Sequence, residues 1–500
     1  MPGPSSRVDR CGRLRAVIGF FAVSLIASLL ALRTVAALTR VEPADGEEPA
    51  LTATDVTTVE THWSETGLRA RPWVPSKRVA TMGRGTRLLV RGSVASRDKS
   101  GCHGQPWYAV WPYGYVCSEH VRRSKQPPPV GAALPLTAGR RLPHDYVIVR
   151  SEAANVYSNA ELVMSMNPLR TLGKGMNLAI ARSLDIDGVA YAETVDGLLI
   201  AKQDIGWLGQ GSEWAGVHLT GAAPGIAFGW TLRDKTPVLA EPDKKAAQID
   251  TLGFRVRVNL LEESGEADPD RFWQIGEGRW IAAANLAEVM ITEPPEGVLR
   301  DNRVHAGFDQ WIDVDLGEQT LVAYRGTVPV FATLVSSGKG SPTPRGNYPI
   351  WAKVASMTMA NQDYEDKPYM VEHVPWVLLF QGHNALHGAY WHDRFGQRRS
   401  HGCVNLSPRD ARWLFEWVSP TLPLGWTGYI PADLDRSVVV HLRDSSRPPA
   451  EAFLQERPIG PPDPEEEKKK VELAEQRRAE ERATADAAAG TPASITPPIQ

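Results

Sequence analysis

Residues 400–405 of this 500-residue chain read Ser400-His401-Gly402-Cys403-Val404-Asn405, and His387-Gly388 lies upstream of them. A cysteine thiol becomes a working nucleophile when a neighbouring base or cation favours its thiolate form. His387 can be that base if residues 389–399, which include Gly396, reverse the chain so that the imidazole meets the sulfur. The hexapeptide therefore predicts a catalytic pair of Cys403 and His387.

The residues that flank Cys403 suit acyl chemistry. Gly402 has no side chain, so the backbone beside the sulfur can approach a bound carbonyl closely. The amides of Gly402 and Cys403 are candidate donors to the oxyanion that forms on attack. Asn405 offers a side-chain amide that can orient the site or hold substrate, and Ser400 is expected to cap or to hydrogen-bond locally.

The sequence upstream of the hexapeptide alternates like strands. Residues 311–316 and 320–324 alternate apolar and polar positions around the turn at 317–319, which predicts a β-hairpin. Further strands are expected at 328–335, 348–354 and 376–380. Ser407-Pro408 then predicts a capped helix after Asn405.

Together these features resemble the YkuD-type L,D-transpeptidase catalytic domain. Its signature is a histidine followed by Gly or Ser, a loop, and Ser/Thr-His-Gly-Cys with a polar residue two positions later. Residues 312–315 with 319–321 resemble its opening hairpin, and residues 336–339 with 342–346 resemble its second landmark. Asn405 departs from the arginine that is frequent at its position. The resemblance covers residues 305–444 and implies a β-sandwich with one helix after the motif.

The resemblance also implies a mechanism. Cys403 attacks the carbonyl of the third residue of a peptidoglycan stem tetrapeptide, while His387 takes the thiol proton and later protonates the departing D-alanine. An amine of a neighbouring stem then resolves the thioester into a 3→3 cross-link. No metal or cofactor is implied, His401 is given a site-shaping role, and the Gly388 carbonyl is the candidate group that orients His387.

The acceptor of the acyl group stays open at this level. A lysine of an envelope protein would attach that protein to peptidoglycan, and water would make the chain an L,D-carboxypeptidase. A non-catalytic wall-binding protein is the alternative of another class, although the intact Cys403, His387 and Gly402 set speaks against it.

A zinc site is the main rival interpretation, because five histidines lie near Cys403: His373, His383, His387, His392 and His401. His383 and His387 have metalloprotease spacing, but Asn384 stands where the catalytic glutamate should be. We therefore predict no metal, and interpret His373 and His392 as surface or structural residues.

Three upstream stretches place turn glycines ahead of alternating apolar residues, which is typical of small β-barrels. They span residues 63–125, 146–207 and 234–292, and they resemble bacterial SH3-like domains. The predicted fold class is therefore mainly β. Cys102 and Cys117 are a candidate disulfide in the first stretch, worth roughly 3 kcal/mol, which would leave Cys403 as the free thiol beyond the N-terminus.

The N-terminus indicates export. Four arginines precede the uncharged residues 16–32, which is the pattern of a signal peptide or a signal anchor over residues 1–40. We expect a periplasmic or cell-envelope protein, with residues 16–32 as a possible inner-membrane anchor and residues 41–62 as a linker. Residues 445–500 are Pro-rich and then highly charged, as in a flexible tail. The net charge of −3 argues against a nucleic-acid partner.

Overall fold

The computed structural model describes residues 49–96, 102–221, 225–265, 271–299, 309–340, 342–360 and 369–448. These residues are mainly strand, with α2 (Ala160–Met164) and α4 (Pro408–Trp417) as their α-helices, so the predicted fold class is confirmed. Neither helix, in this described part of the chain, is long and apolar enough to cross a membrane. The predicted export segment lies outside the described residues.

The C-terminal domain, residues 309–448, contains a six-stranded sheet. Its strands, in spatial order, are β15 (Val217–His218), β26 (Val328–Leu334), β25 (Thr320–Arg325), β24 (Gln310–Asp315), β33 (Val439–Arg443) and β27 (Gly346–Pro349). The predicted hairpin forms β24 and β25, with Asp315 opposite Thr320. The sheet continues through the parallel pairing of β24 with β33.

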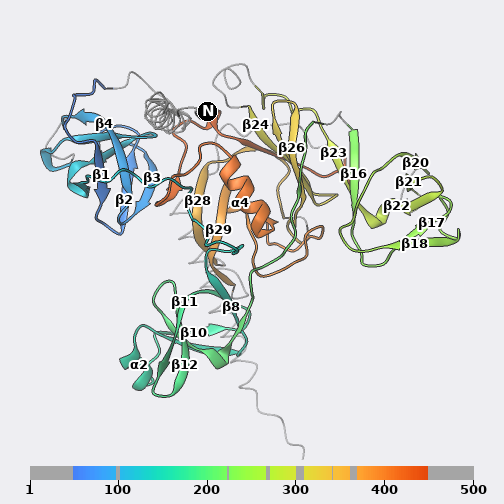
Figure 1. The fold of residues 1–500 in the computed structure, drawn as a ribbon, viewed down its shortest axis with the longest axis horizontal. Coiled ribbons are helices and arrows are strands. Elements are labelled where there is room, and N and C mark those ends of the chain that lie inside the picture. The colour runs from blue at the N-terminus through green and yellow to red at the C-terminus, as the bar shows by residue number, and fades with distance from the viewer. Residues whose placement is uncertain are drawn as a thin grey trace, which may run out of the picture.

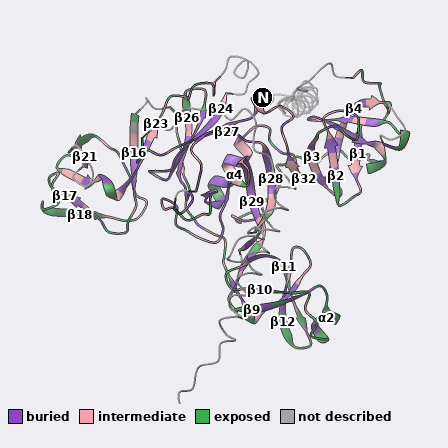
Figure 2. Cartoon of the chain, turned by 180° about the vertical axis from the view of Figure 1, so that it is seen from behind, coloured by how far each residue is buried: buried purple, intermediate pink, exposed green. Residues whose placement is uncertain are grey.

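A second layer of this domain faces the first. It consists of β28 (Ala352–Ala360), β29 (Met370–Gln381), β30 (Asn384–Gly388), β31 (Val404–Leu406) and β32 (Trp426–Tyr429). Ile312 and Val314 share one buried cluster with Leu378 and Phe380 of β29, which makes the domain a two-layer sandwich. Figure 2 shows buried segments, in purple, along β24, β27 and β29.

Helix α4 begins where the sequence predicts. Ser407 is its N-cap and accepts a hydrogen bond from the Asp410 amide (3.2 Å), with Pro408 in the first turn. Leu414 and Phe415 are buried, and the helix packs against β29 and β30. The helix thus supports the strand that carries His387.

The first module starts earlier than predicted. Its strands are β1 (Thr58–Thr61), β2 (Glu65–Arg69), β3 (Arg78–Gly83), β4 (Arg87–Val94), β5 (Trp107–Val110), β6 (Tyr115–Cys117) and β7 (Val121–Arg123). The predicted linker 41–62 is therefore too long, because β1 pairs with both β4 and β7 and buries Val59 completely. Cys102 and Cys117 form a disulfide in this module.

The second module has the strands β8 (Asp145–Val149), β9 (Ala153–Tyr157), β10 (Arg170–Gly173), β11 (Asn177–Ile186), β12 (Val189–Thr194), β13 (Leu199–Ala201) and β14 (Ile205–Trp207). The third has β16 (Gly225–Thr231), β17 (Thr236–Leu239), β18 (Gln248–Leu252), β19 (Arg257–Val258), β20 (Glu262–Ser264), β21 (Phe272–Gly276), β22 (Arg279–Ala282) and β23 (Leu286–Ile291). This module begins before the predicted residue 234, because β16 pairs with β23 and buries Phe228 and Trp230. The SH3-like assignment of all three modules stays a prediction.

The modules surround the C-terminal domain (Figure 1), and the first and second are joined to it by main-chain pairing. Strand β3 of the first module pairs with β32, where Ala80 lies opposite Tyr429. Strand β11 of the second module meets β29, and Tyr146 stacks on Tyr390 with ring centroids 3.7 Å apart. Because strand pairing crosses these two boundaries, the first and second modules are built into the domain and are not spacers.

The start of the predicted tail is also attached. The Ser445 hydroxyl donates to Asp315 (2.9 Å), and the Arg345 side chain donates to the Pro448 carbonyl (2.8 Å). Residues 445–448 therefore belong to the domain. The rest of the predicted tail lies outside the described residues.

The connection between the second and third modules is fixed to the C-terminal domain, and we call residues 208–219 the docked linker. Its strand β15 pairs with β26, with Val217 opposite Ala332. The Trp214 indole donates to the Thr333 hydroxyl (2.9 Å), and this hydroxyl donates to Asp410 (2.6 Å). The Gly216 amide donates to the same carboxylate (2.9 Å).

Gly216→Ala should release the docked linker. A Cβ at this position would lie 2.3 Å from the Ala332 carbonyl oxygen, which is backbone and cannot yield. We expect a loss of about 1–3 kcal/mol in the free energy of unfolding and faster proteolytic cleavage within residues 208–221. Gly173→Ala is the matched control, because its Cβ would meet nothing closer than 4.0 Å. A Gly216→Ala protein with unchanged melting and protease resistance would contradict this account.

Candidate active site

The parallel pairing of β30 with β31 brings His387 close in the sheet to the strand that follows Cys403. His387 lies opposite Asn405, and Leu386 lies opposite Val404. Residues opposite each other in a sheet share a face, and neighbours along a strand alternate. Leu386 and Val404 are fully buried in the core. His387 and Asn405 therefore face the other side, and Cys403 directly precedes β31.

Both members of the catalytic pair are electrically neutral at rest. Burial lowers the pKa of His387 to about 4 and raises the pKa of Cys403 to about 11. The backbone amides of Ala385 and of Cys403 itself act the other way and lower the pKa of the thiol. At neutral pH Cys403 is thus a thiol and His387 is a neutral imidazole, the form that can accept a proton.

The loop before Cys403 is held by short local bonds. The Ser400 hydroxyl donates to the Cys403 carbonyl (2.5 Å) and accepts from the Gly402 amide (3.2 Å). The Gly402 amide already donates to Ser400, so an oxyanion would have to displace that hydrogen bond. The Cys403 amide lies beside its own sulfur and is therefore the better placed of the two predicted donors.

Gly402 packs against a side chain of β30. A Cβ at position 402 would lie 2.3 Å from Oδ1 of Asn384, the first residue of β30, so any other residue would have to displace this side chain. The Gly402 carbonyl accepts from the Thr343 hydroxyl (2.8 Å), which in turn accepts from the Gly338 amide (2.8 Å). The second landmark of the sequence analysis, residues 336–339 with 342–346, thus contacts the hexapeptide.

The comparisons with known proteins agree with this geometry. Residues 309–440 match the family model of the YkuD L,D-transpeptidase catalytic domain. This part of the chain is an L,D-transpeptidase catalytic domain. The family predicted from the hexapeptide is therefore confirmed for the domain that carries Cys403 and His387.

Solved L,D-transpeptidase structures are similar to part of this chain. A mutant of the Enterococcus faecium enzyme is 24% identical, over 27% of this chain and 50% of that one, with a TM-score of 0.22. The enzyme from Mycobacterium smegmatis is 22% identical, over 27% and 58%, with a TM-score of 0.21. The isolated catalytic domain of the Enterococcus faecium enzyme is 23% identical, over 27% and 97%, with a TM-score of 0.22.

This chain covers about half the length of the first solved structures that it matches. None of the curated proteins matches it.

The sequence analysis gives the Gly388 carbonyl the role of orienting His387. After burial, it is the next influence on His387, and it raises the pKa of the imidazole, as a carbonyl beside a ring N–H should. Even so, Nδ1 of His387 has no partner of good hydrogen-bond geometry among the described residues. The contact is therefore electrostatic rather than a well-formed hydrogen bond.

His392 is the site residue that the sequence analysis missed. Its Nε2 lies 2.9 Å from the side-chain amide of Asn405, and its Nδ1 accepts from the Arg394 amide (3.2 Å). Burial lowers the pKa of His392 to about 4, so the ring is neutral and carries its proton on Nε2. The proton on Nε2 needs an acceptor. The oxygen of the Asn405 side-chain amide, rather than its nitrogen, therefore faces His392. No pattern of neighbouring residues predicts this contact, because it forms only where residues 389–399 reverse the direction of the chain.

The remaining histidines lie elsewhere. His401 is exposed and contacts the Tyr369 ring at 5.1 Å, which suits a role at the rim of the site. His373 pairs with Asp196 of the second module (3.0 Å). Among the residues that the structure describes, no three His, Cys, Asp or Glu side chains form a group that could hold a metal ion.

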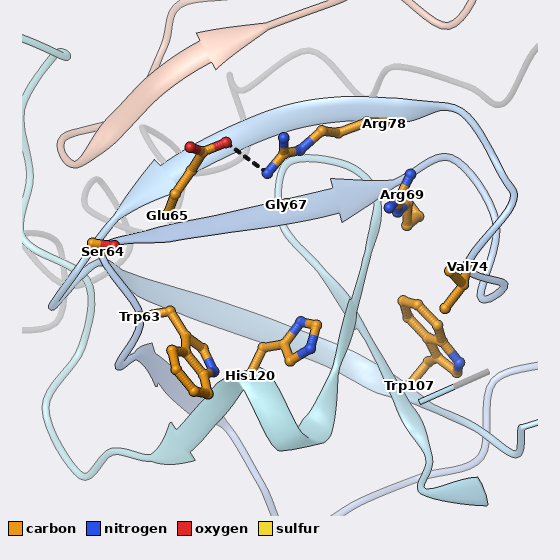
Figure 3. A pocket seen from close by; sticks show the side chains of 9 residues that line it. All are labelled: Trp63, Ser64, Glu65, Gly67, Arg69, Val74, Arg78, Trp107 and His120. Atoms are coloured by element: carbon orange, nitrogen blue, oxygen red, sulfur yellow. Dashed lines mark ion pairs between the residues drawn. The ribbon is translucent and has the colours of Figure 1, made fainter. Parts of the chain in front are cut away.

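The first module has a hollow of its own, of about 340 Å³. Figure 3 shows Trp63 and His120 on one side of it, and Glu65 and Arg78, which form an ion pair (2.9 Å), on the other. None of its lining residues comes from the L,D-transpeptidase domain. It is therefore separate from the catalytic site.

The Cys403 thiol should be protonated in the free protein at neutral pH. Because burial raises its pKa to about 11, the thiolate is disfavoured at every lower pH. We expect no thiolate ultraviolet absorbance at neutral pH beyond that of Cys403→Ser, and an iodoacetamide alkylation rate that keeps rising as the pH approaches about 11. A thiolate band at neutral pH that disappears in His387→Gln would instead indicate a preformed ion pair.

Proposed function

We propose that this chain is an exported peptidoglycan L,D-transpeptidase that transfers an acyl group from a stem tetrapeptide to an amine. The observation that carries the proposal is a domain of this family in which strand pairing places His387 opposite Asn405, two residues after Cys403. The neutral state of both groups suits a mechanism in which the proton moves only when substrate is present.

The first half-reaction forms a thioester. Substrate excludes water, His387 takes the proton of the Cys403 thiol, and the sulfur attacks the carbonyl of the third stem residue. The Cys403 amide stabilises the oxyanion. The bond to D-alanine then breaks, and His387 returns the proton to the departing amine. The products are free D-alanine and the acylated enzyme.

The second half-reaction consumes the thioester. The amine of a neighbouring stem attacks the carbonyl, a C–N bond replaces the C–S bond, and the proton released by the amine passes through His387 to the sulfur. The product is a 3→3 cross-link. An envelope-protein amine or water would give protein attachment or carboxypeptidase activity through the same thioester.

Two features support an envelope location. The arginine-flanked apolar residues 16–32 are typical of an export signal or an inner-membrane anchor. The Cys102–Cys117 disulfide is stable in an oxidising compartment such as the periplasm.

The full-length chain, kept in detergent, should convert a diaminopimelate-containing disaccharide tetrapeptide into a dimer that is lighter than two monomers by one alanine. Cys403→Ala should give none, and His387→Gln should lower the rate about 10²–10⁴-fold, as read by mass spectrometry. His120→Gln, in the first module, is the matched histidine control and should retain activity.

The other outcomes are also informative. Tripeptide without dimer would show that water resolves the thioester, or that a protein acceptor is required. The absence of any Cys403-dependent product would overturn the proposal in favour of a wall-binding protein.

A further inference from the structure

The imidazole of His387 depends on packing for its orientation. Its Nδ1 is buried without a hydrogen-bond partner among the described residues. The Trp391 ring lies beside the imidazole, with centroids 5.8 Å apart and the two planes tilted by 31°. A base has to be held in one orientation to take a proton from a neighbouring group. The position of Trp391 therefore bears on the position of His387.

Three aromatic rings link the second module to this imidazole. Tyr146, in β8 of the second module, stacks on Tyr390 with ring centroids 3.7 Å apart. The Tyr390 ring meets the Trp391 ring edge-on, at 90° and a centroid distance of 5.0 Å. Tyr146 is fully buried, and Tyr390 is nearly so. Because rings packed this closely cannot shift independently, a movement of Tyr146 is passed on to the neighbour of His387.

The hydroxyl groups of the two tyrosines attach this stack to β29. The Tyr390 hydroxyl donates to the Glu372 carbonyl (2.7 Å). The Tyr146 hydroxyl donates to the next carbonyl, that of His373 (2.9 Å), and Asp196 of the same module binds the His373 ring (3.0 Å). His373 has a left-handed backbone with φ of 48°, which costs free energy in a residue other than glycine. The second module therefore holds a strained position of β29.

This strained part of β29 lies against the residue that follows His387. A Cβ at Gly388 would lie 3.3 Å from both Cγ and the carbonyl oxygen of Pro375, two residues after His373. Trp376, the next residue, also has a left-handed backbone, with φ of 57°. The second module meets the first residues of β29 (Figure 1). It thus reaches the catalytic base along two routes, through the ring stack and through the strand beside Gly388.

We propose that Tyr146 is a positioning residue for the catalytic base His387, so that the second module takes part in the reaction. Tyr146 acts through Tyr390 and Trp391, which lie between it and the imidazole. This inference rests on the proposed transpeptidase function and deepens it, because His387 must take and return a proton in each half-reaction. It adds a residue from outside the L,D-transpeptidase domain to those on which the base depends.

Loss of the stack should loosen the packing around His387 and let water reach the ring. Burial is the largest influence on the pKa of His387 and lowers it to about 4, while the Gly388 backbone raises it and His392 lowers it. With burial relieved, the pKa rises toward the ordinary histidine value of 6.5. Because only the neutral imidazole accepts a proton, the acid limb of kcat/KM then moves to higher pH.

The test uses the full-length chain in detergent and two substitutions of Tyr146. Tyr146→Leu removes both the stacked ring and the hydroxyl. Tyr146→Phe keeps the ring and loses only the hydrogen bond to His373. Tyr157→Leu is the matched control, because Tyr157 contacts the Tyr191 ring (centroids 6.5 Å apart) in a buried cluster that belongs to the second module.

The initial rate of alanine release from the disaccharide tetrapeptide measures the reaction. We expect Tyr146→Leu to lower kcat about tenfold, with little change in KM, and to move the acid limb of kcat/KM to higher pH. Tyr146→Phe should give smaller changes in the same directions, and Tyr157→Leu should match the wild type. In a Tyr390→Leu background, Tyr146→Leu should have little further effect, because both residues act through one stack.

A second measurement does not depend on turnover. Histidine labelled with ¹³C at Cε1 reports the pKa of His387 by NMR, and His387→Gln assigns its signal. Tyr146→Leu should raise this pKa toward 6.5, whereas Tyr157→Leu should leave it unchanged. If Tyr146→Leu does not fold, Tyr146→Phe decides, and an unchanged pKa and acid limb in that variant would overturn the proposal.

The failures are distinguishable. An unchanged kcat and an unchanged His387 pKa in Tyr146→Leu would overturn the positioning role and leave the transpeptidase function standing. A slower reaction with an unchanged His387 pKa, or an equal loss in Tyr157→Leu, would show that Tyr146 only stabilises the fold, and would also overturn it. If the wild-type chain shows no Cys403-dependent alanine release, the proposed function fails, and the NMR titration still decides whether Tyr146 positions His387.

Discussion

The parallel pairing of two short strands, β30 and β31, is the constraint on which the catalytic site depends. A slip of one residue would turn His387 into the core and Leu386 out of it, because side chains alternate along a strand. The register is held from both sides. Leu386 and Val404 are fully buried, and the Ser336 backbone exchanges two hydrogen bonds with Asn405 (2.9 and 3.0 Å).

The same packing determines the chemistry of the site. Removing Cys403 and His387 from water penalises their charged forms, so the burial that positions the pair also keeps it neutral. A neutral pair suits a folded resting protein, because no isolated charge has to be held in a dry environment. Reactivity then depends on substrate, which brings the electrophile and completes the exclusion of water.

The upstream modules extend the catalytic domain. Strand pairing joins β3 to β32, and Thr333 and Asp410 hold the docked linker through Trp214 and Gly216. Such buried hydrogen bonds are costly to leave unmade, which makes detachment of these parts unfavourable. The third module contacts the loop of residues 389–399 through the hydrogen bond from Arg255 to Asp393. A change in the docking of this module would therefore act directly on the residues beside His392.

The sequence by itself determined the features that depend on neighbours in the chain. The Ser400–Asn405 hexapeptide, the hairpin at 311–324 and the Ser407-Pro408 helix start could all be predicted, because turns, alternation and caps involve only a few adjacent residues. Only the tertiary structure decided the early start of the first module, strand β15, the contact of His392 with Asn405 and the approach of Arg255 to Asp393. Each of these features depends on a partner that the packing of whole modules brings near. The pattern of adjacent residues does not identify such a partner.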